Sequence, residues 1–123
     1  MVEVVTDGTP FEAEFARALK YFDLLTPGFI TEQIASGLMQ CFVIGGMVFV
    51  TQVEDFPNGK ALRIILAAGS NAKQCVPDAE RFFLEMAKLN GCRTLLTTGR
   101  QGWAKYAKRL GWQVFNEYRK ELK

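Results

Sequence analysis

Apolar positions along the chain change their spacing several times, and each spacing predicts a different element. They recur every three to four positions over residues 10–22 and again over 77–89, as in amphipathic helices. Between these stretches lie three apolar, β-rich runs, CFVI, MVFVTQV and ALRIILAA, separated by the turn sequences Gly45-Gly46 and Pro57-Asn58-Gly59. The sequence therefore predicts an antiparallel meander of strands over 40–44, 47–54 and 60–68. Their nearly continuous apolar character favours a sheet that is covered on both faces.

The flanking stretches complete the predicted order. Val2 to Val5 reads as a short strand, and Thr31 to Ser36 as a short helix. Pro77 suits the first position of the next helix, and RTLLTT at 93–98 follows as a strand parallel to 60–68 through a right-handed crossover. A last helical stripe, in which we expect Trp103, Ala107 and Leu110 to be buried, covers 103–110, and WQVFNEY at 112–118 predicts a closing strand. The expected order is β-α-α-β-β-β-α-β-α-β, an α/β (α+β) mixed sheet in a single domain over residues 1–123.

Composition narrows the class of protein. With 123 residues, 49% of them apolar and 23% charged, the chain is expected to form one folded domain. No apolar run approaches the roughly 20 residues that cross a bilayer, and the N-terminus lacks the pattern of a signal peptide. We therefore expect no membrane partner and a cytoplasmic location.

Residues suited to metal binding or nucleophilic catalysis are scarce. There is no histidine, which excludes Ser-His and Cys-His pairs and removes the commonest metal ligand. Cys41, Cys75 and Cys92 are widely spaced and odd in number, so they predict free thiols and no metal site.

Charge is distributed unevenly along the chain. Residues 1–92 carry 7 basic and 11 acidic side chains, net −4, whereas residues 93–123 carry 8 basic and 2 acidic ones, net +6. The C-terminal third could meet phosphate, an acidic protein or nucleic acid, or could simply be a solvated surface. Nucleic acid is the least favoured, because no recognised binding motif is present and the whole chain carries only +2.

The element order, together with the stretch TTGRQGWAKYAKRLGW at 97–112, resembles the GNAT fold of acyl-CoA-dependent N-acetyltransferases. Within that family the turn Gly99-Arg100-Gln101-Gly102-Trp103 is similar to one in small GNAT-like proteins of tailed bacteriophages. The resemblance implies acetyl-CoA as cofactor, two parallel strands that splay apart, and the backbone of Leu66, Ala67 and Ala68 as the edge that binds the pantetheine arm. It also implies host cytoplasm, or a virion, as the location.

Two family motifs match only in part. The phosphate loop Gln/Arg-x-x-Gly-x-Gly/Ala aligns with residues 74–79, where Gln74 and Ala79 fit as cofactor-binding candidates. Pro77 replaces the middle glycine and removes an N–H donor, and Asp78 adds a negative charge beside the expected phosphates. Ordinary chemistry of a helix that starts at Pro77 explains both residues and is the favoured interpretation of them, which leaves Gln74 as the candidate of this loop.

The second motif, Asn-x-x-Ala-x-x-x-Tyr-x-x-x-Gly-Phe, aligns its end with Gly111-Trp112. The tyrosine position is Ala107, and Tyr106, one residue away, is the candidate acid that would protonate the leaving thiolate. The asparagine position is Arg100, which could clamp a phosphate or carboxylate. It could equally cap the sheet or pair with Glu54 or Asp55. No acidic residue on 61–68 offers a general base.

Two functions of different classes follow. The first is a phage-type, acetyl-CoA-dependent N-acetyltransferase acting on an amine, with a degenerate phosphate loop and a displaced tyrosine. The alternative is a non-catalytic GNAT-like module that binds a host or virion protein through its basic C-terminal face. Fold alone does not decide between them.

Overall fold

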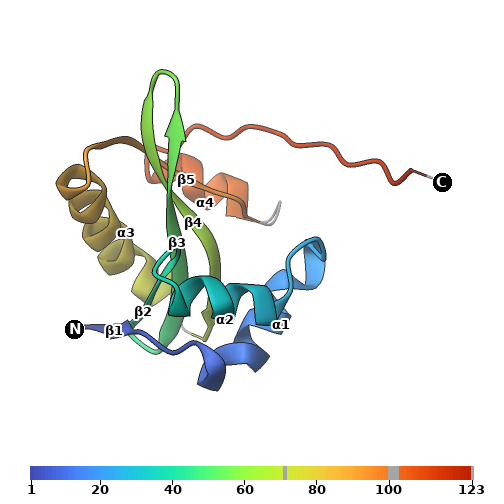
Figure 1. Ribbon diagram of the computed structural model, residues 1–123. Helices are drawn as coiled ribbons and strands as arrows, with labels where there is room; N and C mark the ends of the chain where they lie inside the picture. Colours follow the sequence, from blue (N-terminus) through green and yellow to red (C-terminus); the bar gives the residue numbers. More distant parts are fainter. Residues whose placement is uncertain (71, 100–102, 123) are drawn as a thin grey trace.

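A computed structural model of the chain describes residues 1–70, 72–99 and 103–122, apart from the side chain of Tyr21 (Figure 1). The elements are strands β1 (Val2–Val5), β2 (Gln40–Ile44), β3 (Met47–Phe56), β4 (Gly59–Gly69) and β5 (Cys92–Thr97), and helices α1 (Glu12–Ala18), α2 (Pro27–Ala35), α3 (Ala72–Leu89) and α4 (Ala104–Arg109). Single 3-10 turns, η1 (Thr9–Phe11) and η2 (Leu19–Tyr21), flank α1. None of the described helices is both long and apolar enough to cross a membrane.

The strands form one mixed sheet in the sequence order β1-β2-β3-β4-β5. The first four are antiparallel neighbours, and β4 pairs with β5 in parallel. Both predicted turns are present: Gly45 and Gly46 have φ of 58° and 84° in the β2–β3 hairpin, as a two-residue turn of this kind requires. The predicted meander and parallel crossover are therefore confirmed.

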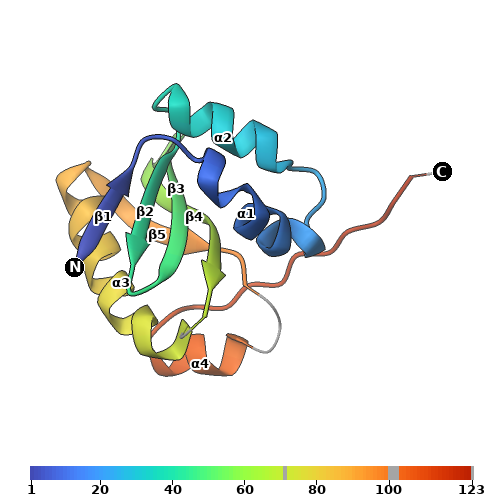
Figure 2. The ribbon, with the colours of Figure 1, turned by 90° about the horizontal axis from the view of Figure 1, so that it is seen from below.

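Two cores cover the two faces of this sheet, with α1 and α2 on one face and α3 on the other (Figure 2). On the first face Phe15 and Ile30, both 0% exposed, pack on Val50. On the second, Phe83 is 0% exposed and meets the rings of Phe42 and Phe49 edge to face, with centroids 5.9 and 5.3 Å apart. The alternation of strand side chains between the faces explains why the central runs are apolar almost throughout.

Two helices begin earlier than the sequence predicts. Helix α2 starts at Pro27, where Thr26 caps it by accepting a hydrogen bond from the Phe29 N–H over 3.2 Å. Helix α3 starts at Ala72, so the expectation that Pro77 is its first residue is wrong. The amphipathic stripe continues upstream of the proline, because Cys75 is buried on the same face as Ala79 and Phe83. Proline therefore marked a position inside the helix, and burial of this longer stripe outweighs the hydrogen bond it removes.

The C-terminal end departs most from expectation. The closing strand predicted over 112–118 is wrong: described residues 110–122 contain no strand, and the chain leaves α4 as an extended tail (Figure 1). None of the residues of α4 is buried, and Trp103, Ala107 and Leu110 are half-buried, so the prediction that these three are buried is also wrong. A six-residue helix with a single short stripe has little surface with which to reach the sheet.

Candidate functional site

The parallel pair β4–β5 ends before β4 does. Its last paired residues are Ile64 and Thr97, whereas β4 continues through Gly69. The Thr97 hydroxyl donates a hydrogen bond to the Ile64 carbonyl over 3.2 Å and closes the last rung of this ladder. Beyond this point β4 pairs with β3 on one side and with no strand on the other, among the residues that the structure describes.

A register shift in β4 coincides with this divergence. Val50 of β3 pairs with Leu66, but its neighbour Thr51 pairs with Ile64, so Ile65 is an extra residue without a partner. Such a bulge bends a strand and increases its local twist. The bulge lies one residue beyond the last rung of the β4–β5 ladder, where a bend would turn the end of β4 away from β5.

The three residues expected to hold a pantetheine arm lie along this unpaired edge. Leu66 and Ala68 turn their side chains into the core on the α1 face, and Ala67 is exposed. Because their side chains are small or buried elsewhere, the backbone groups on the β5 side of the strand are the polar atoms that this edge offers. The structure therefore brings the three predicted residues together, and their role stays a prediction.

The start of α3 follows the end of β4 directly. Gly69 has φ of 134°, and a Cβ there would lie 2.9 Å from the Gly46 carbonyl oxygen, so this junction requires glycine. Lys73 and Gln74 lie in the first turn of α3, which contains no acidic side chain. The free N–H groups of this first turn and the Lys73 ammonium favour an anion.

Because α3 starts at Ala72, the residues that match the phosphate loop lie at different depths in this helix. Gln74 is exposed in the first turn, whereas Ala79 is 3% exposed and packs in the α3 core. Asp78 lies in the second turn and forms an ion pair with Arg81. Asp78 and Pro77 therefore lie in the second turn of α3, after the helix start.

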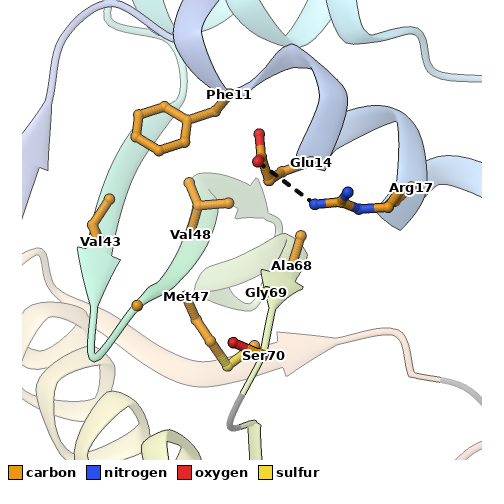
Figure 3. A pocket seen from close by; sticks show the side chains of 10 residues that line it. Phe11, Glu14, Arg17, Val43, Met47, Val48, Ala68, Gly69 and Ser70 are labelled. Atoms are coloured by element: carbon orange, nitrogen blue, oxygen red, sulfur yellow. Dashed lines mark ion pairs between the residues drawn. The ribbon is translucent and has the colours of Figure 1, made fainter.

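A hollow of about 480 Å³ lies between α1 and the end of β4 (Figure 3). It is lined by Phe11, Glu14, Arg17, Val43, Gly46, Met47, Val48, Ala68, Gly69 and Ser70. One wall is apolar and comes from β2 and β3, and the opposite wall carries the charged pair of α1. Ala68 belongs both to this hollow and to the unpaired edge, so the two features adjoin.

Glu14 is the acidic residue of this hollow. Its Oε1 lies 3.5 Å from a guanidinium nitrogen of Arg17, while its Oε2 is buried and has no hydrogen-bond partner among the described residues. A carboxylate oxygen without a donor is costly to bury, so a ligand or water donor there would stabilise it. Sequence reasoning missed Glu14, because a search for a base along β4 does not find a residue that α1 brings to the end of that strand.

The remaining candidates lie at the C-terminal end. Tyr106 is half-buried and meets Trp103 edge to face with ring centroids 5.6 Å apart. Arg100 lies outside the described residues. Glu54, one of the partners considered for Arg100, pairs with Arg63: both of its carboxylate oxygens accept from Arg63 Nε at 2.9 Å. Among the described residues no group of three His, Cys, Asp or Glu side chains could hold a metal ion.

Comparison with solved structures places this geometry in a known fold. A probable acetyltransferase superposes with a TM-score of 0.75 at 7% identity, covering 100% of this chain and 98% of its own. The ribosomal-protein-alanine N-acetyltransferase of Brucella melitensis biovar Abortus 2308 gives 0.73 at 7% identity over 99% of both chains. Glucosamine-6-phosphate N-acetyltransferase of Arabidopsis thaliana gives 0.61 at 12% identity over 99% and 98%.

These likenesses establish the fold. The chain has the mixed α+β fold of GNAT acetyltransferases, as the sequence resemblance implied. No protein-family model matches the sequence, and no curated protein matches it either. At identities this low the likeness shows the backbone fold alone. Any chemistry must be argued from the side chains of the site itself.

Proposed function

We infer that this protein is an acyl-CoA-dependent N-acetyltransferase that binds acetyl-CoA along the unpaired edge of β4 and transfers the acetyl group to an amine. The observation that carries this proposal is the end of the β4–β5 ladder at Ile64 and Thr97, five residues before β4 itself ends at Gly69. An amide-bearing chain laid along that edge makes the main-chain hydrogen bonds that β5 leaves unmade.

The first turn of α3 suits the pyrophosphate of the same cofactor. It follows the end of β4 after a short connection, offers free N–H groups, and carries Lys73 with no acid in that turn. Gln74 adds an exposed amide donor. The anion site is therefore predicted at residues 72–74, upstream of the Pro77-Asp78 pair.

Glu14 is the proposed general base for the acceptor amine. When bound, acetyl-CoA supplies an activated acetyl group, and the amine must lose a proton as it attacks. The Glu14 carboxylate, with a free acceptor oxygen beside a hollow that meets β4 at Ala68, would take that proton directly or through one water. Tyr106 is the proposed donor of a proton to the departing thiolate, and Arg100 a further contact to the cofactor.

Calorimetric titration of the purified chain with acetyl-CoA and with free CoA tests the binding step. We expect saturable binding of both, followed by thiol release when acetyl-CoA is mixed with a panel of amines. Absence of heat from either ligand, in protein whose circular dichroism shows an intact fold, would reject the cofactor site.

The second proposal is a non-catalytic GNAT-like module that binds a host or virion protein. Lys105, Lys108 and Arg109 of α4 are exposed, as a basic face for a host or virion protein would require. A phage-type origin rests on the Gly-Arg-x-Gly-Trp turn, most of which lies outside the described residues. The same titration separates the two proposals, because the non-catalytic module binds no CoA.

A further inference from the structure

The hollow between α1 and the end of β4 combines an apolar wall with one acidic and one basic side chain. Phe11, Val43 and Val48 supply the apolar wall (Figure 3). Among the ten described residues that line the hollow, Glu14 is the one acid and Arg17 the one base. Its volume of about 480 Å³ lies within the range of pockets that hold small molecules. The hollow therefore suits a small ligand with an apolar body and few charges.

Both charged side chains of the hollow have room for a further partner. Their closest nitrogen and oxygen are 3.5 Å apart, a longer separation than that of a charge-assisted hydrogen bond. One Glu14 oxygen is buried without a hydrogen-bond partner, and the Arg17 side chain, 70% exposed, has no other partner among the described residues. A ligand that carries both a cationic donor and an anionic acceptor would satisfy both groups.

The spacing of the pair limits how far apart the charges of such a ligand can be. Glu14 and Arg17 are three residues apart on α1, and side chains at that spacing are neighbours, with about 5–6 Å between their Cβ atoms. A ligand that contacts both must carry its cation and its anion close together. An α-amino acid does so, because its ammonium and its carboxylate are attached to one carbon atom.

Other classes of amine match this lining less well. A polyamine carries several cations, whereas the hollow offers one carboxylate. A sugar needs several polar partners for its hydroxyls, and Ser70 is the one hydroxyl among the described lining residues. The N-terminus of a peptide carries a neutral amide in place of the carboxylate and leaves the Arg17 guanidinium without an anion. A free amino acid with an apolar side chain uses all three features of the hollow.

We propose that the acceptor bound in this hollow is a free α-amino acid with an apolar side chain. Its ammonium pairs with Glu14 and its carboxylate with Arg17, and its side chain packs on the wall formed by Phe11, Val43 and Val48. This assignment names the substrate class of the acetyl transfer proposed above and rests on that proposal.

The ammonium of such an acceptor must lose two protons during the transfer. It gives the first to Glu14, which passes it to water, and the free amine nitrogen then attacks the carbonyl carbon of the acetyl group. The new C–N bond forms as the thioester C–S bond breaks, and the second proton of the nitrogen goes to the departing thiolate. The products are an N-acetyl amino acid, CoA as its free thiol and one proton released to water.

Calorimetric titration of the full chain with amino acids, with and without saturating free CoA, tests the proposal without any acetyl transfer. We expect L-leucine to bind at least about tenfold more tightly than L-leucinamide, which lacks the carboxylate, and than spermidine, a polyamine. L-glutamate has the same ammonium and carboxylate on a charged side chain, and it should also bind at least about tenfold more weakly than L-leucine.

Arg17→Gln is the diagnostic variant. It should weaken L-leucine binding by about tenfold and should not weaken L-leucinamide binding, because the amide has no charge for the guanidinium to meet. Arg81→Gln is the matched control. Arg81 is likewise exposed and paired with an acid three residues away, Asp78, but it lies on α3 outside the hollow. This control should leave the affinity for both ligands unchanged.

The outcomes separate this proposal from the proposed function. Binding of CoA without binding of L-leucine, whether CoA is present or absent, overturns the amino-acid acceptor and leaves acetyl transfer standing. Binding of L-leucine without binding of CoA supports the amino-acid site and rejects the transfer. L-leucinamide that binds as tightly as L-leucine points to a peptide N-terminus and overturns the proposal. So does an Arg81→Gln variant that loses as much affinity for L-leucine as Arg17→Gln.

Discussion

The body of the protein, residues 1–97, and its C-terminal segment, residues 103–122, bury apolar side chains very differently. The body places α1 and α2 on one face of the sheet and α3 on the other, with Phe15, Ile30 and Phe83 at 0% exposure. In the C-terminal segment α4 has no buried residue, and Phe115 exposes 82% of its surface. Both regions have apolar residues at regular spacing, so periodicity alone does not separate a packed element from an unpacked one.

The difference extends from packing to the candidate chemistry. The unpaired edge of β4, the first turn of α3 and Glu14 all belong to the packed body. Tyr106 belongs to the loosely packed C-terminal segment, and Arg100 lies outside the described residues. Residues that bind a ligand must be held in place by the elements around them. The body is therefore the better candidate for the binding site. Three sets of measurements test this comparison, and a fourth tests burial within the body.

The largest expected effect is on stability. Phe83→Ala should lower the free energy of unfolding by about 3–5 kcal/mol, because it empties a fully buried aromatic site beside Phe42 and Phe49. Trp103→Ala should lower it by only about 1 kcal/mol, since Trp103 is half-buried. Urea denaturation measures both. Equal losses from the two variants would contradict the contrast in packing.

The next largest effect concerns catalysis. Glu14→Gln should reduce kcat/KM for acetyl transfer by about 100-fold while leaving affinity for CoA unchanged, because it removes a general base and keeps the side chain's shape. Steady-state assays of thiol release, with calorimetry for CoA, provide the two readouts. Tyr106→Phe is the matching change at the C-terminal end. A larger loss from Tyr106→Phe than from Glu14→Gln would move the essential proton transfer to α4.

Cofactor affinity gives a smaller effect. Lys73→Glu reverses the charge at the start of α3 and should weaken CoA binding by about tenfold. Lys88→Glu, in the last turn of the same helix, should change it little, and Lys108→Glu tests the basic face of α4. Calorimetric titration compares the three. If Lys108→Glu alone weakened binding, the phosphates would lie at the C-terminal face.

The prediction with the smallest expected effect concerns the reactivity of the cysteine thiols. Burial raises the pKa of the Cys41 thiol from about 9 to about 11, so its thiolate is scarce near neutral pH. Cys92, half-buried on β5, should therefore react with a thiol reagent much faster than Cys41 on β2. Peptide mapping after timed labelling identifies the modified sites.

The same shift makes stability depend on pH. A folded-state pKa that is raised contributes stability fully present below pH about 9 and lost as the pH rises toward about 11. Urea midpoints measured across this interval should fall. Rapid labelling of Cys41 in native protein would show that the strand β2 face is more open than the core contacts indicate.

Local sequence was enough for much of the fold. The Gly45-Gly46 and Pro57-Asn58-Gly59 turns fix the antiparallel meander, because their backbone conformations allow few other connections. The helix between β4 and β5 makes those strands parallel, since a crossover of that length returns the chain in the same direction. The predicted pantetheine edge at residues 66–68 follows from the same order of elements.

Other features depended on contacts between distant residues. The start of α3 at Ala72 is set by burial of Cys75 and Ala79 against the sheet, which overrides the local signal of Pro77. Glu14 reaches the end of β4 only because α1 packs across the sheet there.

The sequence by itself determined which segments can be strands or helices and how consecutive ones connect, because those choices rest on short-range spacing and turn geometry. Only the tertiary structure decided which of them pack, since burial requires a partner surface. The segment 112–118 has the pattern of a strand, and in the structure it pairs with no strand among the described residues, while Trp112 contacts Glu80 and Arg119 contacts Asp23.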